Sequence, residues 1–186
     1  MKNKSISATE AFNRLVEGNA RYLCSKTCPG DVSPAIRTET SKNGQKPYAV
    51  VVSCADSRVI PEAVFSAGIG ELFVVRVAGN VIDNNQLGSI QYAVEHLGSN
   101  LVVVLGHTQC GAVGAALHEN DGYIKCITDE IKCAIGNETD GTKASVLNVQ
   151  HSVEKIKNLL SLPDGVTVCG ALYHTDSGRV EFLAGF

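Results

Sequence analysis

The chain of 186 residues is 44% hydrophobic and 19% charged, a composition typical of one globular domain and not of a disordered chain. Its formal net charge is −3 and it has no cluster of lysine or arginine, so nucleic acid is not an expected partner. No apolar run approaches the ~20 residues that cross a bilayer, so we do not expect a membrane partner either.

The cysteines and the first residues indicate a cellular compartment. The start of the chain is positively charged but lacks the apolar core of a signal peptide, which predicts a cytoplasmic protein. Seven cysteines form an odd set in a chain large enough to fold without disulfides, so we expect mostly reduced thiols. Cys126, Cys133 and Cys169 are predicted to be small apolar packing residues. A second metal or redox pair at Cys24 and Cys28 lacks evident partner ligands.

The first 46 residues are predicted to form an N-terminal arm. Residues 7–23 have a partial apolar face typical of a helix, although Gly18 and Asn19 allow either one bent helix or two short ones. Residues 24–46 are rich in Ser, Thr, Pro, Gly and charge, which predicts a long connection. Because this arm has little core of its own, we expect it to pack on a partner subunit.

The rest of the chain alternates apolar runs with helical patterns. The predicted strands cover residues 48–54, 71–78, 101–105, 166–172 and 179–183, and the predicted helices cover 61–65, 83–97, 110–117, 123–136 and 143–160. This alternation predicts a single domain over residues 1–186 with a three-layer α/β fold. Its sheet would have four mostly parallel strands plus an antiparallel edge strand, flanked by helices.

Three potential metal ligands follow two of the predicted strands. Cys54 ends the first strand, while His107 and Cys110 follow the third and are three residues apart. The carboxyl edge of a parallel sheet is where ligands bind, and a tight turn or helix start can aim His107 and Cys110 at one point. A Cys₂His set without a fourth protein ligand is typical of a catalytic zinc site. We therefore expect one zinc ion per chain.

A carboxylate and a guanidinium lie beside the first ligand. Asp56 and Arg58 alone are weak evidence, since such pairs often only hold a loop together. Two thiolates would neutralise the zinc dication, so the metal would acidify its bound water less strongly. Asp56 could then orient a zinc-bound hydroxide, while Arg58 keeps Asp56 ionised. Alternatively, Asp56 could bind the zinc and close the site at low pH. Gly111, at the start of the next helix, would favour an anionic substrate.

At this point the chain resembles the carbonic anhydrases of the beta class. The resemblance runs from about Ala11 to the last strand and is carried by four segments: Cys54-Ala55-Asp56-Ser57-Arg58, Arg76-Val77-Ala78-Gly79-Asn80, Gln91-Tyr92-Ala93-Val94-Glu95-His96-Leu97 and Gly106-His107-Thr108-Gln109-Cys110-Gly111. It implies reversible hydration of carbon dioxide to bicarbonate and a proton. It also implies a homodimer, with larger assemblies of dimers in the family.

The resemblance assigns roles by position. Cys54, His107 and Cys110 match the zinc ligands, and Asp56 and Arg58 match the catalytic dyad. Two further positions match residues that contact the substrate. Gln45 corresponds to a glutamine that donates a hydrogen bond to bicarbonate, and Tyr92 to a tyrosine lining a pocket at the dimer interface.

The chain departs from one branch of the family at a single position. The bicarbonate-inhibited branch has tryptophan three residues before its first cysteine, whereas this chain has Val51 there and no tryptophan, which predicts a constitutively open site.

A hydrolase of carbon disulfide or carbonyl sulfide on the same scaffold is the nearest rival function. A catalytically silent zinc-binding regulator is the other, and the Asp–Arg pair argues against it. Bicarbonate supply and pH balance are both compatible with the sequence.

Overall fold

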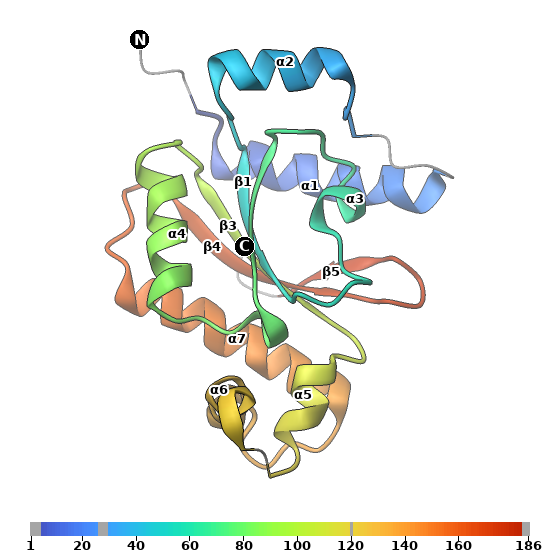
Figure 1. Cartoon of the computed structure of the whole chain (residues 1–186), viewed down its shortest axis with the longest axis vertical. Helices are drawn as coiled ribbons and strands as arrows, with labels where there is room; N and C mark the ends of the chain where they lie inside the picture. The colour runs from blue at the N-terminus through green and yellow to red at the C-terminus, as the bar shows by residue number, and fades with distance from the viewer. Residues whose placement is uncertain (1–4, 26–29, 120, 184–186) are drawn as a thin grey trace.

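The computed structural model describes residues 5–25, 30–119 and 121–183. Its centre is one five-stranded sheet in the order β2-β1-β3-β4-β5 (Figure 1). Neighbouring strands are parallel except for β5, which runs antiparallel to β4. The strands are β1 Ala49–Ser53, β2 Leu72–Arg76, β3 Leu101–His107, β4 Thr167–Tyr173 and β5 Val180–Phe182. The predicted α/β fold with four parallel strands and an antiparallel edge strand is confirmed.

Helices cover both faces of this sheet, which explains why its central strands are continuous apolar runs. Every residue of β1 and β3 is buried. Alternate side chains of these strands enter two separate cores, one with α1 and α3 and the other with α4 and α7. The bounds of these helices are Ala8–Cys24 for α1, Pro61–Val64 for α3, Asn84–Glu95 for α4 and Gly141–Leu159 for α7.

The N-terminal helix α1 is a single helix of 17 residues, capped by the Ser7 hydroxyl. Gly18, which the sequence suggested as a weak point, lets α1 approach the segment after α3: a Cβ there would lie 2.0 Å from the Phe65 carbonyl oxygen. Asn19 is 5% exposed and donates to the carbonyls of Val64 and Gly178. These two residues therefore join elements and do not divide the helix.

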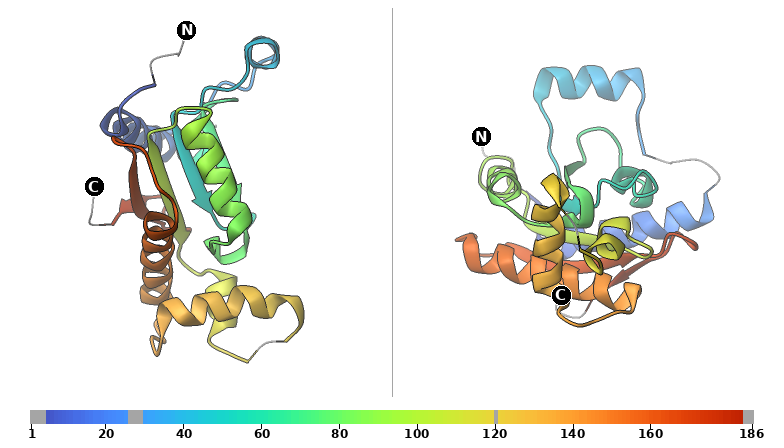
Figure 2. Two further views of the ribbon diagram at one scale, coloured as in Figure 1. Left: turned by 90° about the vertical axis from the view of Figure 1, so that its left-hand side faces the viewer. Right: turned by 60° about the horizontal axis from the view of Figure 1, so that its bottom comes forward.

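The prediction of a plain connection over residues 24–46 was wrong, because it contains the helix α2, Pro34–Asn43. The Ser33 hydroxyl accepts a hydrogen bond from the Ile36 N–H at its start, and Gly44 ends it with a φ of 77°. No residue of α2 is buried within the chain, and both views of Figure 2 show it standing apart from the sheet. Local capping thus forms α2 without a core beneath it.

Helix α4 has a capping box at its N-terminus and a histidine C-cap. Asp83 and Gln86 form a capping box at its start, in which each side chain bonds the other residue's backbone N–H. His96 is the C-cap, and its ring lies 5.3 Å from the Tyr92 ring. His96 therefore ends α4 and lies beside the exposed Tyr92.

A third apolar cluster lies beyond the carboxyl end of β3 and contains α5, Gly111–Ala116, and α6, Lys125–Ile135, which follows the short 3₁₀ helix η2, Gly122–Ile124. Cys126 and Cys133 lie on α6 and are exposed, so the prediction that they pack in the interior was wrong. Cys169 on β4 is 3% exposed, as predicted. Among the described residues, no helix combines the length and apolarity needed to cross a bilayer.

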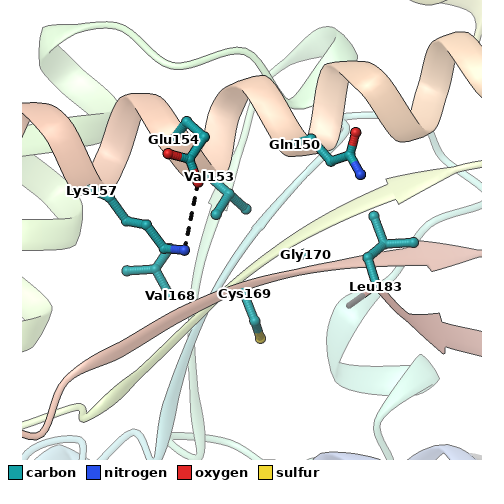
Figure 3. A pocket seen from close by; sticks show the side chains of 8 residues that line it. All are labelled: Gln150, Val153, Glu154, Lys157, Val168, Cys169, Gly170 and Leu183. Atoms are coloured by element: carbon teal, nitrogen blue, oxygen red, sulfur yellow. Dashed lines mark ion pairs between the residues drawn. The ribbon is translucent and has the colours of Figure 1, made fainter. Parts of the chain in front are cut away.

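Helix α7 lies unusually close to the sheet because two strand glycines face it. A Cβ on Gly106 would lie 2.4 Å from Val149 Cγ2, and a Cβ on Gly170 would lie 2.6 Å from Val149 Cγ1. Further along β4, α7 and the strand border a groove of about 310 Å³. Figure 3 shows Val153 over this groove and the Cys169 side chain on the opposite side of β4. The close approach brings α7 to the end of β3, where His107 lies.

Candidate metal centre

Two adjacent strands bring three potential ligands together. Cys54 directly follows β1, His107 is the last residue of β3, and Cys110 is the N-cap of α5. Since β1 and β3 pair in register, their carboxyl ends lie side by side. The ligand atoms of the three residues all lie within 4.8 Å of one another, and all three residues are buried. The juxtaposition predicted from the strand ends is therefore present.

The cluster has the donor atoms and spacing of a zinc site. The two sulfurs are 4.0 Å apart, close to the roughly 3.8 Å expected for two thiolates at ~2.3 Å from a tetrahedral zinc ion. The His107 Nδ1–H donates to the Thr108 carbonyl at 2.9 Å, which leaves the lone pair on Nε2. Among the described residues, the buried Nε2 has no hydrogen-bond partner. An unpartnered buried nitrogen beside two sulfurs fits a bound metal.

The environment of the cluster ionises one of its thiols. The contact with Cys110, aided by His107 and the Gly79 N–H, lowers the pKa of Cys54 to about 4 against the opposing effect of burial. The same sulfur–sulfur contact, together with burial, raises the pKa of Cys110 above its ordinary value. A bound cation would favour the doubly ionised pair, as zinc ligation requires.

Asp56 lies next to the cluster and is held by Arg58 through both carboxylate oxygens. Arg58 Nε donates to Asp56 Oδ1 at 2.9 Å, and Arg58 Nη2 donates to Oδ2 at 2.8 Å. These bonds lower the pKa of the Asp56 carboxyl well below its usual range. The Oδ2 atom is 3.9 Å from His107 Nε2. An ionised carboxylate thus lies at the edge of the metal cluster.

A second arginine shapes the loop that carries Cys54 and Asp56. Arg76, at the end of β2, donates to the carbonyls of Cys54 at 3.2 Å, Asp56 at 2.8 Å and Val59 at 2.8 Å. Three oxygens of one loop therefore converge on one guanidinium. The sequence suggested the surrounding segment only through the family resemblance and did not indicate this role of Arg76.

Two of the predicted substrate residues do not reach the cluster within one chain. Gln45 precedes β1 at its amino end, whereas Cys54 lies at the carboxyl end of that strand. The Tyr92 ring lies 6.1 Å from the Phe73 ring, and Phe73 pairs with Val50. Both residues are exposed, with Tyr92 at 48%. Their predicted role therefore requires a second chain.

The third predicted substrate residue, Gly111, does lie beside the cluster. It is the first residue of α5 and directly follows Cys110. Nothing lies within 4 Å of a Cβ built on it. Its open surroundings leave the space that the predicted substrate contact requires.

Comparison with known proteins identifies the family. A carbonic anhydrase family model matches residues 49–180. A carbonic anhydrase of Mycolicibacterium smegmatis is 38% identical over 189 residues, which cover 92% of this chain and 91% of the relative. The chain belongs to the beta-carbonic anhydrase family. Members of this family are zinc enzymes, and the Cys–His–Cys cluster is where this chain could bind a metal.

Solved structures show how widely the beta-carbonic anhydrase fold is shared. A tetrameric beta-carbonic anhydrase of Sordaria macrospora has a TM-score of 0.67 at 23% identity, covering 81% of this chain and 92% of that one. A carbon disulfide hydrolase has a TM-score of 0.60 at 15% identity, covering 82% and 89%. The same scaffold therefore occurs in proteins with different substrates.

The groove of Figure 3 is separate from the metal cluster of this beta-carbonic anhydrase. Its lining comes from α7, β4 and Leu183, and it includes none of the three ligands. Sequence reasoning also missed two backbone groups near Cys54: the Gly79 N–H, 3.3 Å from its sulfur, and the Gly79 carbonyl, which accepts from Asn148. The only indication of these contacts in the sequence is the glycine itself, because a φ of 69° at position 79 favours glycine.

Proposed function

We propose that this chain catalyses the reversible hydration of carbon dioxide to bicarbonate and a proton, with one zinc ion held by Cys54, His107 and Cys110. The observation that carries the proposal is the buried Cys–His–Cys cluster with ligand atoms within 4.8 Å. Asp56, fixed by Arg58, lies directly beside it. A purely structural metal would need no such carboxylate.

The chain's own residues divide the chemistry between them. Bound zinc supplies the Lewis acidity that makes water nucleophilic near neutral pH. Asp56 Oδ2, 3.9 Å from His107 Nε2, would accept a hydrogen bond from a water held at the metal site and so direct the lone pair of that water at the carbon of carbon dioxide. Arg58 keeps Asp56 ionised and binds both of its carboxylate oxygens, which supports the open form of the site. Gly111, which follows Cys110 and has open surroundings, leaves space beside the cluster for bicarbonate.

A second copy of the chain supplies the remaining substrate contacts. We propose a homodimer in which the partner's Gln45 donates to bicarbonate and the partner's Tyr92 lines the pocket, because neither position lies at the cluster within one chain. Within the arm over residues 1–46, α1 packs on the sheet of its own chain, and the solvent-exposed α2 is the part that packs on the partner. A dimer of dimers is compatible with the tetrameric relative. Ligand cysteines that must stay reduced support a cytoplasmic location.

The test is stopped-flow carbon dioxide hydration between about pH 6.5 and 9, on protein with its zinc content quantified. We expect activity proportional to zinc at one ion per chain. Asp56→Asn should abolish most of it while keeping the zinc. The matched control is Asp129→Asn, which removes an exposed carboxylate paired with Lys125 on α6 and should leave the rate unchanged.

The same preparation separates the rival functions. Zinc-loaded protein that is inactive with carbon dioxide even at the highest pH contradicts the proposal. Turnover of carbon disulfide by that protein would then indicate the hydrolase, and inactivity with both substrates would indicate a zinc-binding regulator. Gel filtration combined with light scattering checks the dimer, and a monomeric active enzyme would exclude roles for the partner's Gln45 and the partner's Tyr92.

A further inference from the structure

A tight backbone turn next to the metal cluster donates a hydrogen bond to one of its sulfurs. This turn is the 3₁₀ helix η1, Ala78–Asn80. The Gly79 N–H lies 3.3 Å from Cys54 Sγ. Gly79 has φ 69° and ψ 15°, and a Cβ on it would lie 2.7 Å from Ile131 Cδ1. Since glycine crosses easily between backbone conformations, something must hold its peptide groups in this orientation.

A buried side chain of α7 holds the other end of the same residue. Asn148 Nδ2 donates to the Gly79 carbonyl at 2.7 Å, and Asn148 is 1% exposed. Because a carbonyl can only accept, this contact also fixes which end of the amide faces the turn. One turn further along α7, Ser152 Oγ donates to the Asn80 carbonyl at 3.2 Å. Two side chains of one helix therefore bind two consecutive carbonyls of the turn.

Burial of the Asn148 amide lowers the stability of the fold. Among the described residues, its Oδ1 has no hydrogen-bond partner, although it is buried. An unsatisfied buried acceptor destabilises a fold, so an apolar side chain would serve packing alone at least as well. What the amide offers in addition is its bond to Gly79, the residue that donates to Cys54.

We propose that Asn148 is a positioning residue for the metal thiolate: by binding the Gly79 carbonyl, it aims the Gly79 N–H at the Cys54 sulfur. This inference rests on the proposed zinc site. A hydrogen bond to a metal thiolate draws charge from the sulfur and fixes its direction, as other outer-shell partners do for their ligands. Asn148 thereby makes Cys54 a less electron-rich and better oriented ligand, and it does so from a helix that supplies no ligand.

The test replaces zinc by cobalt(II), whose thiolate charge-transfer absorption reports the electron density of the sulfur. Asn148→Leu removes the donor and keeps a branched side chain of similar shape, and Asn148→Ala provides a second variant with less steric demand. In both, we expect the absorption to move to longer wavelength, because a sulfur without its hydrogen bond is more easily oxidised. We also expect a chelator to remove zinc more readily, with affinity lowered on the order of tenfold.

Ser152→Ala is the matched control. It removes the neighbouring hydrogen bond from the same helix face, but its target, the Asn80 carbonyl, belongs to a residue whose N–H does not contact the sulfur. Its absorption and zinc affinity should match the wild type even if its thermal stability falls. All variants are compared as folded, metal-loaded protein, checked by circular dichroism.

The outcomes separate this inference from the proposed function. An unchanged cobalt absorption in both Asn148 variants overturns the inference, and so does an equal shift in Ser152→Ala, which would mark a general loosening of α7. Failure of the wild-type protein to bind cobalt or zinc would instead contradict the metal site itself. A shift confined to the Asn148 variants supports the positioning role whether or not carbon dioxide is the substrate.

Discussion

Gly106→Ala tests the close contact between α7 and the sheet. The new Cβ would lie 2.4 Å from Val149 Cγ2, whereas carbon atoms pack at roughly 3.5–4.0 Å, so α7 or the strand must move by about 1 Å. Overpacking of this kind costs about 1–3 kcal/mol, and the lower unfolded-state entropy of alanine returns about 0.4–1 kcal/mol. We expect a net loss of about 1–2 kcal/mol, or roughly 2–8 °C in melting temperature for a chain of this size.

The assay is urea unfolding at one fixed protein and zinc concentration, with a double-mutant cycle. Val149→Ala alone should destabilise the protein, but adding Gly106→Ala to it should cost nothing further, because the clashing methyl group is gone. Gly141→Ala, on the first turn of α7 where a Cβ meets nothing within 4 Å, is the control and should not destabilise. Additive effects of Gly106→Ala and Val149→Ala would refute the contact as the cause.

Three further predictions follow from single side chains. Asp56 has a lowered pKa in the folded state, so its stabilising effect is present above the unfolded pKa of about 3.9 and is lost as the pH falls through the folded pKa. The stability gap between wild type and Asp56→Asn should therefore shrink below about pH 4 in urea titrations; a constant gap would contradict this. Burial raises the pKa of Cys169 to about 12, so peptide mapping after alkylation at neutral pH should find it unmodified and exposed Cys126 labelled. Asn19→Ala leaves the buried Gly178 carbonyl and Val180 N–H without their partner and should cost about 3 kcal/mol, measured by thermal unfolding; a loss below about 1 kcal/mol would contradict it.

The sheet and the three ligands were predictable because their signals are local. The β-branched runs of β1 and β3 are buried on both faces, and Cys54 and His107 lie at their ends. Parallel pairing then brings strand ends together without any knowledge of side-chain contacts. The cap at Asp83 is local in the same way, since a capping box spans only four consecutive residues.

The sequence did not reveal features that have no apolar periodicity or that join residues far apart in the chain. Helix α2 has no apolar face, and only its flanking Ser33 and Gly44 indicated where it begins and ends. Asn148 bonds a carbonyl 69 residues away, and a hydrogen bond to backbone leaves no trace in the partner's side chain. Gln45 matched the family by its spacing from the first ligand, but the structure places it at the far end of β1.

The strand order has a consequence for how the chain folds. The two sulfur ligands are 56 residues apart, and β2 and α4 lie between them in the sequence. A parallel crossover must therefore close before Cys54 and Cys110 can meet, which makes this a slow, nonlocal step. Metal captured there acts as a clip across a long loop, and its stabilising effect grows with the chain entropy that the loop would otherwise regain. Zinc uptake during refolding would thus report the pairing of β1 with β3.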